Sequence, residues 1–394
     1  MMPMWLRSYK TEINPTQEQI GKINRTIGVS RFIYNFYLAK NKDIYEEEKR
    51  FMSGYDFSKW LNHDFIPNHP EYQWIKEVSS KATKQSIMNG EKAFKKFFKK
   101  QSKFPRFKKK SKSDVKAYFP KNNVADWTVD RHKIKIPTLG FVRLKEKGYL
   151  PSNVKVKSGN VSKKAGRYYV SVLVETEENY TNKPIGVGLG IDLGIKDFAI
   201  VNTMDKPFIN IHKTKSVKDL EKKLKREQRR LSRKYESLKK RNENKETKGV
   251  ATRQNIQKQI VKVQKLHQRL SNRRENYTNQ VVNQIVGQEP SHITIEDLNI
   301  SGMMKNRHLS KAIQKQNFYS FRLKLTNKCK QNGIELRIVD RWYPSSKTCS
   351  MCGSIKKDLK LSDRAYVCSE CGCAIDRDKN ASINLANAKV YKVA

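Results

Sequence analysis

The sequence predicts a mixed α+β chain of several domains, and three patterns support that prediction. Apolar residues recur at helical spacing in two long stretches, residues 14–110 and 216–286. Strand-like alternation lies between them, as in YYVSVLVE at 168–175. Five of the six cysteines fall between positions 349 and 373. With 394 residues, the chain has the length of two or three domains.

The charge of the chain narrows the class of partner. Lys and Arg number 82 against 38 Asp and Glu, a net charge of +44. A compact protein with this charge repels itself unless a partner offsets it. A polyphosphate is the obvious partner, which means nucleic acid ahead of an anionic membrane, and a small-metabolite enzyme with a neutral surface is disfavoured.

The sequence contains no segment expected to enter a membrane. The opening MMPMWLRSYK lacks an apolar run long enough for a secretion signal, and no later stretch approaches 18 apolar residues. We therefore expect a soluble, cytoplasmic protein that associates with the nucleoid when it is bound to DNA, with no membrane partner.

The first third of the chain is expected to be a strand followed by helices. Residues 1–12 are typical of a strand, and Asn14, Pro15 and Thr16 resemble a helix start. Residues 92–116 close this region with twelve basic residues and one acidic residue, interleaved with five phenylalanines. The phenylalanines fit either a core stripe or a nucleic-acid surface, whereas the charges favour phosphate contact. The candidate phosphate-binding residues are Lys95, Lys96, Lys99, Lys100, Lys103, Arg106, Lys108, Lys109 and Lys110.

Strands are expected next, and then a long helical hairpin. Residues 115–180 predict a small β-barrel or sheet with a hairpin turn at SKKAGR, 162–167, and residues 186–201 predict two buried strands joined by a tight turn. Leucines at 220, 224, 231 and 238 predict one helix, and a second follows the polar break RNENKETKGVAT at 241–252. Residues 216–275 have 21 basic and seven acidic residues, so this hairpin is either a second phosphate-binding surface or a solvated hairpin without a partner.

The last third alternates strands with helices. We expect strands at 292–298 and 334–340, a helix through about 310–331, and a final helix that begins near Asp376. Cys329 continues the apolar spacing of Phe318, Phe321 and Leu325, so it is assigned to core packing.

Four cysteines have the spacing of a structural zinc ribbon. Cys349 and Cys352 form one Cys-x-x-Cys pair, and Cys368 and Cys371 form the other. Four thiolates so arranged can hold one tetrahedral Zn²⁺ ion, and the site looks closed, which favours a structural role over a catalytic one. Cys373 could replace Cys371, but the repeated Cys-x-x-Cys-Gly unit favours Cys371.

Three carboxylates stand in unusual surroundings. Asp192 lies inside an apolar strand, Glu296 ends another, and Asp378 falls in the first turn of the last helix. A buried carboxylate is costly unless it is paired or bound to a cation. On adjacent elements, the three could hold two Mg²⁺ ions for phosphodiester hydrolysis. By spacing alone, Asp197, Asp297 and Asp376 compete with them, and Asp376 could be simply a helix cap.

These segments resemble one family. GIDLGIKDFAIV, ITIEDLNISGM and SSKTCSMCG…LSDRAYVCSECGCAIDRDKNASINL are similar to the three split RuvC segments of TnpB proteins, which are RNA-guided nucleases encoded by insertion sequences and related to type V CRISPR effectors. INPTQEQ…RFIYNFYL and FPRFKKK also match. The resemblance implies that Asp192, Glu296 and Asp378 are the catalytic metal ligands, and that Arg364 assists them. Because all three acids are present, it disfavours the inactivated descendants of the family.

The resemblance also implies an architecture. Residues 1–12 and 113–184 would form a wedge β-barrel, interrupted by a helical recognition domain at 13–112. An RNase H-like (RuvC) nuclease would follow at 185–346 and 374–394, with the helical hairpin inserted at about 216–286. The zinc ribbon at 347–373 would be an insertion that binds target nucleic acid.

The implied function is RNA-guided cleavage of double-stranded DNA by one RuvC-type site that uses two Mg²⁺ ions. The expected partners are a guide RNA made from the transposon end and a target DNA with a short flanking motif, and the protein is expected to be monomeric with its RNA. The acids occur in the order Asp, Glu, Asp, whereas transposases of the DDE type have Asp, Asp, Glu, so strand transfer is disfavoured. A miniature type V CRISPR effector, a guided repressor that does not cut, and an unguided nuclease or RNA-binding protein remain as alternatives.

Overall fold

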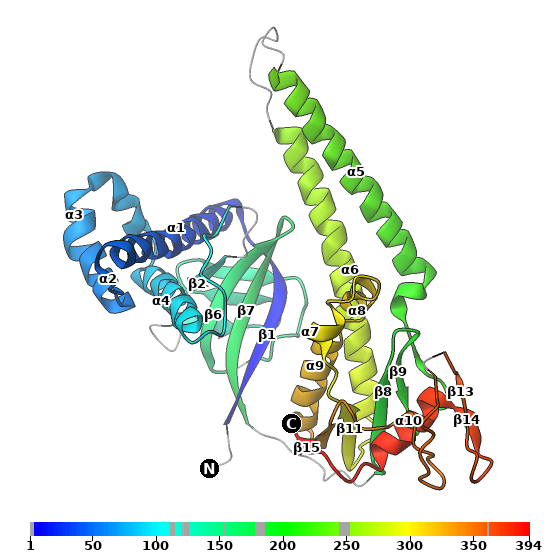
Figure 1. Ribbon diagram of the computed structural model, residues 1–394. Coiled ribbons are helices and arrows are strands. Elements are labelled where there is room, and N and C mark those ends of the chain that lie inside the picture. The colour runs from blue at the N-terminus through cyan, green and yellow to red at the C-terminus, as the bar shows by residue number, and fades with distance from the viewer. Residues whose placement is uncertain are drawn as a thin grey trace. The chain divides into compact units, whose positions relative to one another are not determined.

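The computed structural model describes residues 4–110, 115–119, 121, 126–152, 154–177, 186–243, 253–360 and 362–394 (Figure 1). The chain forms two compact units, one before and one after residue 178. The predicted domain boundaries at 112/113 and 184/185, and residues 244–252 of the polar break, lie outside the described residues. No helix of the described part of the chain combines the length and the apolar character that a bilayer crossing requires.

The first unit begins with a strand and a helical layer, as predicted. Its strand β1 spans Met4–Asn14, and Pro15 follows it. Its helical segments are α1 (Gln17–Glu48), α2 (Gly54–Trp60), η1 (Leu61–Phe65), α3 (Ile66–Asn68), η2 (Pro70–Glu77) and α4 (Ser80–Phe98). Thr16 caps α1, because its side chain accepts from the backbone of Gln19 while the Gln19 side chain accepts from the backbone of Thr16. Aromatic rings of α1, α2 and α4 make much of the core between these helices, with Tyr37 and Phe57 fully buried.

A seven-stranded antiparallel sheet completes the first unit. Its order is β2-β6-β7-β1-β5-β4-β3. The strands not yet given are β2 (Lys116–Phe119), β3 (Thr128–Val129), β4 (Lys133–Ile136), β5 (Gly140–Leu144), β6 (Val156–Lys164) and β7 (Arg167–Glu177). The predicted turn between β6 and β7 is present, with Ala165 and Gly166 both at positive φ, as a tight hairpin requires. Trp127, beside β3, lies against Gly159 of β6, so the two ends of the strand order contribute to one core.

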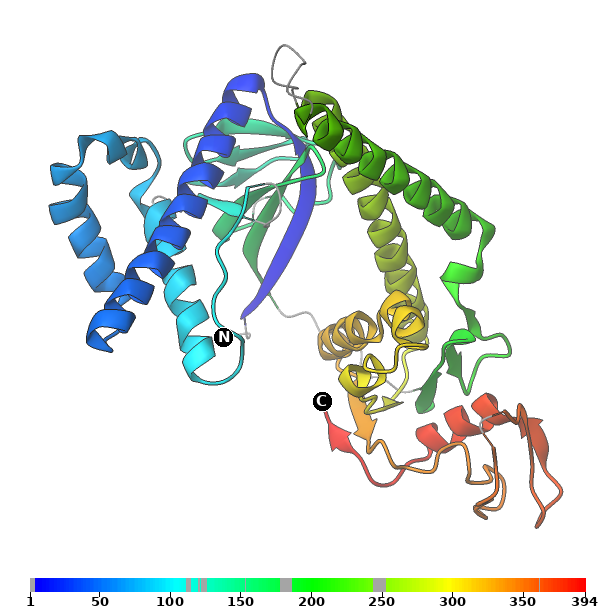
Figure 2. The same ribbon diagram turned by 45° about the horizontal axis from the view of Figure 1, so that its top comes forward.

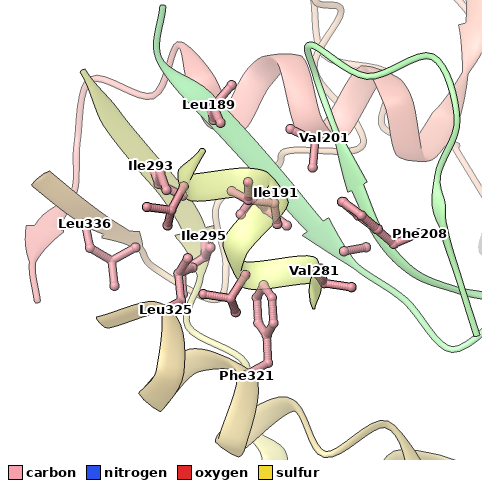
Figure 3. Packing of buried hydrophobic residues seen from close by; sticks show 14 of the residues in the cluster. Leu189, Ile191, Val201, Phe208, Val281, Ile293, Ile295, Phe321, Leu325 and Leu336 are labelled. Atoms are coloured by element: carbon pink, nitrogen blue, oxygen red, sulfur yellow. The ribbon is translucent and has the colours of Figure 1, made fainter. Parts of the chain in front are cut away.

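The second unit is built on a six-stranded sheet with the order β10-β9-β8-β11-β12-β15. Its strands are β8 (Leu189–Leu193), β9 (Asp197–Val201), β10 (Phe208–Ile209), β11 (His292–Glu296), β12 (Glu335–Val339) and β15 (Lys392–Val393). β8 pairs antiparallel with β9 and parallel with β11, and β11 pairs parallel with β12. Ile191, Ile293 and Leu336 point to one face of this sheet, where α6 and α9 cover them (Figure 3).

The opposite face of the sheet carries the last helix, α10 (Arg377–Ala386). Residues alternate across a strand, so Gly190 and Asp192 of β8 share the face opposite to Ile191. A Cβ atom on Gly190 would lie 1.9 Å from the carbonyl oxygen of Ser382 and 2.4 Å from the backbone nitrogen of Ala386. Glycine at 190 therefore allows α10 to pack directly on the backbone of β8.

The inserted hairpin consists of η4 (Ile211–Lys213), α5 (Lys215–Glu243) and α6 (Gln254–Val286). Figure 2 shows α5 and α6 as long helices that pack on each other. The predicted leucines of α5 are only half-buried. A polar contact that the apolar pattern does not predict joins the helices, because Gln259 donates to the buried Glu227 side chain at 2.7 Å.

The remaining helices are α7 (Ile300–Met303), α8 (Ser310–Gln316) and α9 (Phe318–Gln331). The prediction of one helix over 310–331 is wrong at Asn317, whose φ of 58° ends α8 before α9 begins. Asparagine is one of the residues that adopt this left-handed conformation most readily. Cys329 of α9 is buried in the hydrophobic core of the second unit with Phe321 and Leu325, as predicted.

Candidate functional site

Three carboxylates from distant parts of the chain meet on the α10 face of the second sheet. Asp192 lies near the end of β8, and Glu296 ends the neighbouring parallel strand β11. Asp378 lies in the first turn of α10. The negative charges of Glu296 and Asp378 both act on Asp192, so the fold brings together the three acids that the sequence singled out.

The first turn of α10 is fixed from several sides. Asp376 caps the helix by accepting from the backbone nitrogens of Asp378 and Lys379 at 2.9 and 3.0 Å. The Lys379 ammonium donates to the carbonyl oxygens of Val201 and Met204, at the end of β9. These contacts determine where Asp378 lies relative to the sheet.

The carboxylate cluster is electrostatically unfavourable as it stands. Burial, reinforced by the charges of Glu296 and Asp378, raises the pKa of Asp192 to about 8, with Arg377 opposing the rise. Burial also raises the pKa of Glu296, against a hydrogen bond from Ser345. Carboxyl groups whose pKa is raised by burial and by neighbouring carboxylates are expected where a cation binds. Among the described residues, one oxygen from each of the three carboxylates cannot be chosen so that all three lie within 4.8 Å of one another, so these groups are spaced more widely than the four sulfur atoms described below.

The competing acids have other roles in the structure. Asp297 pairs with Arg322 at 2.6 Å and is half exposed. Asp197 begins β9. Burial, together with the negative charge of Asp197, raises the pKa of the Tyr277 hydroxyl to about 12. Asp376 is the cap of α10, as the alternative interpretation held. The geometry therefore favours Asp192, Glu296 and Asp378 over their neighbours.

The two Cys-x-x-Cys pairs form one compact cluster. The four Sγ atoms lie within 4.8 Å of one another, with Cys349–Cys371 and Cys352–Cys368 each at 3.6 Å. Gly353 and Gly372 follow the two pairs at φ of 79° and 69°, which places both turns in the left-handed region. A hydrogen bond from the Ser354 side chain is the main cause that lowers the pKa of Cys368, to about 6. The thiolate is the form that binds metal.

The backbone explains why Cys371, and not Cys373, belongs to the cluster. Cys349 donates its N–H to the carbonyl of Ser354, and Cys368 donates its N–H to the carbonyl of Cys373. In both turns the acceptor is five residues after the first cysteine, so Cys373 occupies the position of Ser354 in the repeated turn. Cys371 occupies the position of Cys352.

The cysteine cluster is connected directly to the carboxylates. Its hairpin, β13 (Ala365–Val367) and β14 (Ala374–Asp376), leads into α10. Arg364 stands at the start of this hairpin, with one guanidinium nitrogen 3.9 Å from a carboxylate oxygen of Asp378. The residue that the family resemblance pairs with the three acids therefore lies beside one of them.

The basic segment at 92–116 has a mixed environment. Phe94 is buried in the helical core, as the core interpretation requires, whereas Phe98, Phe104 and Phe107 are about half exposed. Lys95 pairs with Glu91 at 3.1 Å, and the Lys108 ammonium lies 3.7 Å from the centre of the Tyr34 ring. Asn35 fixes the backbone of Lys108 with two hydrogen bonds. The other predicted phosphate-binding residues are Lys96, Lys99, Lys100, Lys103, Arg106, Lys109 and Lys110, and residues 111–114 lie outside the described part.

A polar pocket lies beside this segment. It has a volume of about 440 Å³, and α1, α4, β2, β6 and Lys108 line it. Gln85, Asn89 and Asn160 supply amide groups to its wall. These residues cannot be singled out from the sequence, because polar side chains on ordinary helices and strands give no spacing signal.

Ser345, Asn380 and Asn384 were also missed. Ser345 donates to a carboxylate oxygen of Glu296, and the two asparagines hold the segment that contains it. All three side chains are buried. The one available signal was the pair of asparagines spaced four residues apart on a helix whose other inward residues are small or apolar.

Three family models match the chain. The model described as "Probable transposase" matches residues 171–307, which include Asp192 and Glu296. The model described as "Cas12f1-like, TNB domain" matches residues 318–385, which include the four cysteines and Asp378. A "Helix-turn-helix domain" model matches residues 2–50, where this chain has one strand and one continuous helix.

Two curated relatives match almost the whole chain. The protein named "Putative RNA-guided DNA endonuclease" from Streptomyces pristinaespiralis is 30% identical over 98% of this chain and 90% of its own length. "Putative RNA-guided DNA endonuclease InsQ" from Escherichia coli is 29% identical over 97% of this chain and 92% of its own length. The solved structure titled "Cryo-EM structure of the Cas12f1-sgRNA-target DNA complex" shares the fold with a TM-score of 0.55 at 17% identity, covering 96% of this chain and 84% of that one.

Proposed function

Because the chain belongs to the TnpB family of RNA-guided DNA endonucleases, which is related to Cas12f, we propose that it cuts both strands of a guide-matched DNA target at the carboxylate cluster. The guide RNA would derive from the transposon end. Base pairing with that guide would supply most of the sequence specificity, and the protein would recognise a short motif that flanks the target.

The observation that carries this proposal is the meeting of Asp192, Glu296 and Asp378 from three separated segments. The strand order of the second sheet, β10-β9-β8-β11-β12, combines an antiparallel meander with parallel strands, which supports the proposal of an RNase H-like (RuvC) nuclease domain. Asp192 lies near the end of β8 and Glu296 ends its parallel neighbour β11, and Asp378 lies in the first turn of α10, the helix that covers them.

The donor set of this cluster fits Mg²⁺, because hard oxygen ligands are what this ion prefers. Asp192, Glu296 and Asp378 would hold two ions, which supply a water nucleophile at neutral pH and stabilise the leaving oxygen. Arg364 and Arg377 flank Asp378 and oppose the negative charge there. Their guanidinium groups would also face the phosphate of the bound strand.

The four cysteines would hold one structural Zn²⁺ ion. A tetrahedral site with Zn–S bonds of about 2.3 Å has sulfur atoms about 3.8 Å apart. Two of the sulfur separations here are 3.6 Å and all are below 4.8 Å, so the site needs little rearrangement to accept the ion. The ribbon at 347–373 would then contact target nucleic acid next to the active site.

Guide RNA and target DNA would occupy the basic surfaces of both units. The segment at 92–116 and the hairpin helices α5 and α6 together concentrate much of the net charge of +44. The wedge barrel at 1–12 and 113–184 is supported by the shared core of the first sheet, and the helical recognition domain at 13–112 by α1 to α4. The amide-lined pocket offers donors and acceptors of the kind that contact base edges, so it supports recognition of the flanking motif by this unit. We propose that the protein acts as a monomer wrapped in its RNA.

The test is an Asp192→Ala variant purified with its guide RNA. We expect Mg²⁺-dependent cleavage of a matched duplex to fall by at least roughly 1,000-fold, because a metal ligand is lost, while guide RNA binding is retained. Asp197→Ala is the matched control, since Asp197 lies on the adjacent strand outside the cluster. An Asp192→Ala variant that cuts at the wild-type rate would contradict the assignment.

Sequencing the RNA that co-purifies with the protein tests the guide. Transposon-end transcripts support the proposal, whereas CRISPR-array transcripts would identify a miniature type V effector. If the wild-type complex binds its target but does not cut it, the protein is instead a guided repressor.

A further inference from the structure

A short segment between β12 and the cysteine cluster, residues Ser345–Ser350, is fastened to α10 by two asparagines. Asn384 donates from its amide nitrogen to the carbonyl oxygens of Ser345 and Thr348, both at 2.7 Å. Asn380 donates to the same carbonyl of Thr348 at 2.7 Å and accepts from the backbone nitrogen of Ser350 at 2.9 Å. Four side-chain hydrogen bonds therefore fix six residues of irregular chain to one face of one helix.

The fastened segment contacts the carboxylate cluster and contains one member of the cysteine cluster. At one end, the Ser345 hydroxyl donates to a carboxylate oxygen of Glu296. At the other end, Cys349 is the first cysteine of the sulfur cluster. Asn380 is fully buried, and Ser345 and Asn384 are 5% and 7% exposed, so solvent does not compete for these hydrogen bonds.

Buried amides of this kind are costly unless they have a defined partner. Apolar residues would pack this face of α10 equally well, as Leu385 and Ala381 do beside them. What the asparagines add is a fixed position of the segment, since the amide group of each forms hydrogen bonds only with partners in a narrow range of positions.

We propose that Ser345 is a positioning residue for Glu296, and that Asn384 and Asn380 lock Ser345–Ser350 against α10 so that Ser345 keeps its hydrogen bond. The inference rests on the proposed function, because it assumes that Glu296 is a metal ligand. A carboxylate ligand with one oxygen engaged by a fixed hydroxyl presents its remaining lone pairs in one orientation. Loss of such an outer partner typically weakens metal affinity or activity by about 10–100-fold.

The experiment compares Ser345→Ala with Ser345→Thr, which keeps the hydroxyl, and with Ser346→Ala, the matched control one residue along the same segment. Each variant is purified as the complete complex with guide RNA. Two quantities are measured, namely Mn²⁺ binding by calorimetry in the absence of DNA, and the Mg²⁺ concentration that gives the half-maximal single-turnover cleavage rate. The unfolding temperature is recorded for each variant.

We expect Ser345→Ala to weaken Mn²⁺ binding and raise the Mg²⁺ requirement by about 10-fold. Ser345→Thr should restore both to within about threefold of the wild type, and Ser346→Ala should change neither. If Ser345→Ala lowers only the unfolding temperature and leaves both metal readouts unchanged, the residue is merely structural and the inference is wrong.

A double variant tests the role of the asparagine. Asn384→Ala alone should raise the Mg²⁺ requirement through the displaced segment, and Ser345→Ala combined with Asn384→Ala should be no worse than the more severe single variant, because both act on the same hydrogen bond. Additive effects would overturn the coupling. Failure of the proposed function is distinguishable, since wild-type protein would then show no Mg²⁺-dependent cleavage at all.

Discussion

The cysteine cluster and the carboxylate cluster lie on the same unit, but the chain assembles them differently. The four cysteines come from two nearly identical turns within 23 residues, and their sulfur atoms are already close together. The three carboxylates come from positions 192, 296 and 378, and they meet only because β8, β11 and α10 pack on one another. One cluster depends on local turns, and the other depends on the whole sheet.

The two clusters also differ in what they cost the folded protein. The Ser354 hydroxyl contacts the sulfur atoms of Cys352 and Cys368, and it lowers the pKa of Cys368 to about 6, whereas the pKa of Cys371 is raised to about 12. The carboxylates repel each other, and Asp192 is held away from water with a raised pKa. A local site of this kind can therefore add stability when a metal binds, whereas carboxylates brought together across a sheet destabilise the protein unless a cation offsets their charge.

The largest expected effect is loss of the cysteine site. Wild-type protein should contain about one zinc per chain by elemental analysis, and Cys349→Ala should contain almost none, because three thiolates do not complete the closed site. Structural zinc contributes roughly 10–16 kcal/mol in isolated fingers, so residues 347–373 should become susceptible to limited proteolysis. Cys373→Ala is the control and should keep its zinc. Retention of zinc by Cys349→Ala would refute the ligand set.

An intermediate effect is expected where the carboxylate site depends on packing. Gly190→Ala places a Cβ against backbone atoms of α10 that cannot move aside, so the free energy of unfolding should fall by about 1–3 kcal/mol or more. Cleavage should fall as well, because Asp378 moves with α10. Gly21→Ala in α1 is the control, since no heavy atom lies within 4 Å of its Cβ, and it should stabilise the protein by about 0.4–1 kcal/mol. If urea titration gives the same free energy of unfolding for Gly190→Ala and Gly21→Ala, close packing of α10 on residue 190 is not required for stability.

Removal of the buried charge is expected to raise stability instead of lowering it. Between about pH 4, where the carboxyl of the unfolded chain titrates, and about pH 8, where Asp192 titrates in the folded protein, the folded state binds a proton that the unfolded state releases. The contribution of this group to stability is therefore lost as pH rises through that window. Asp192→Asn removes the effect, so without added magnesium its unfolding temperature should exceed that of the wild type by about 2–4 °C at pH 8, for each kcal/mol gained, and by little at pH 5.

Added magnesium should reverse the order of the unfolding temperatures of the wild type and Asp192→Asn. Wild-type protein should be stabilised by added Mg²⁺, whereas Asp192→Asn should respond weakly. A variant that is less stable than the wild type without magnesium would show that the carboxylates are not strained.

The sequence predicted the positions of helices and strands better than the contacts between them. Period-two and helical spacing located β1, α1, the β6–β7 hairpin, β8, β9 and the α5–α6 hairpin, because these patterns reflect which face of each element is buried. The same reasoning missed the break at Asn317, since a single left-handed residue leaves the apolar spacing of Phe318, Phe321 and Leu325 unchanged.

The candidate site divides in the same way. The cysteine cluster follows from local spacing, and the cap at Asp376 follows from helix-start chemistry. The three acids needed the family resemblance to separate them from Asp197 and Asp297, because only tertiary packing decides which carboxylates share a face. Ser345, Asn380 and Asn384 could not be predicted, because their partners are backbone atoms and a carboxylate far away in sequence.

Because α10 is made long after β8, it can pack on Gly190 only late in synthesis. Asp192 leaves the ribosome 186 residues before Asp378, and translation at about 5–20 residues per second makes that an interval of roughly 10–40 s. During this time the α10 face of β8 is uncovered and the carboxylate cluster lacks its third member. A nascent chain can therefore fold its first unit before the carboxylate cluster is complete, and any product truncated before α10 lacks the third carboxylate.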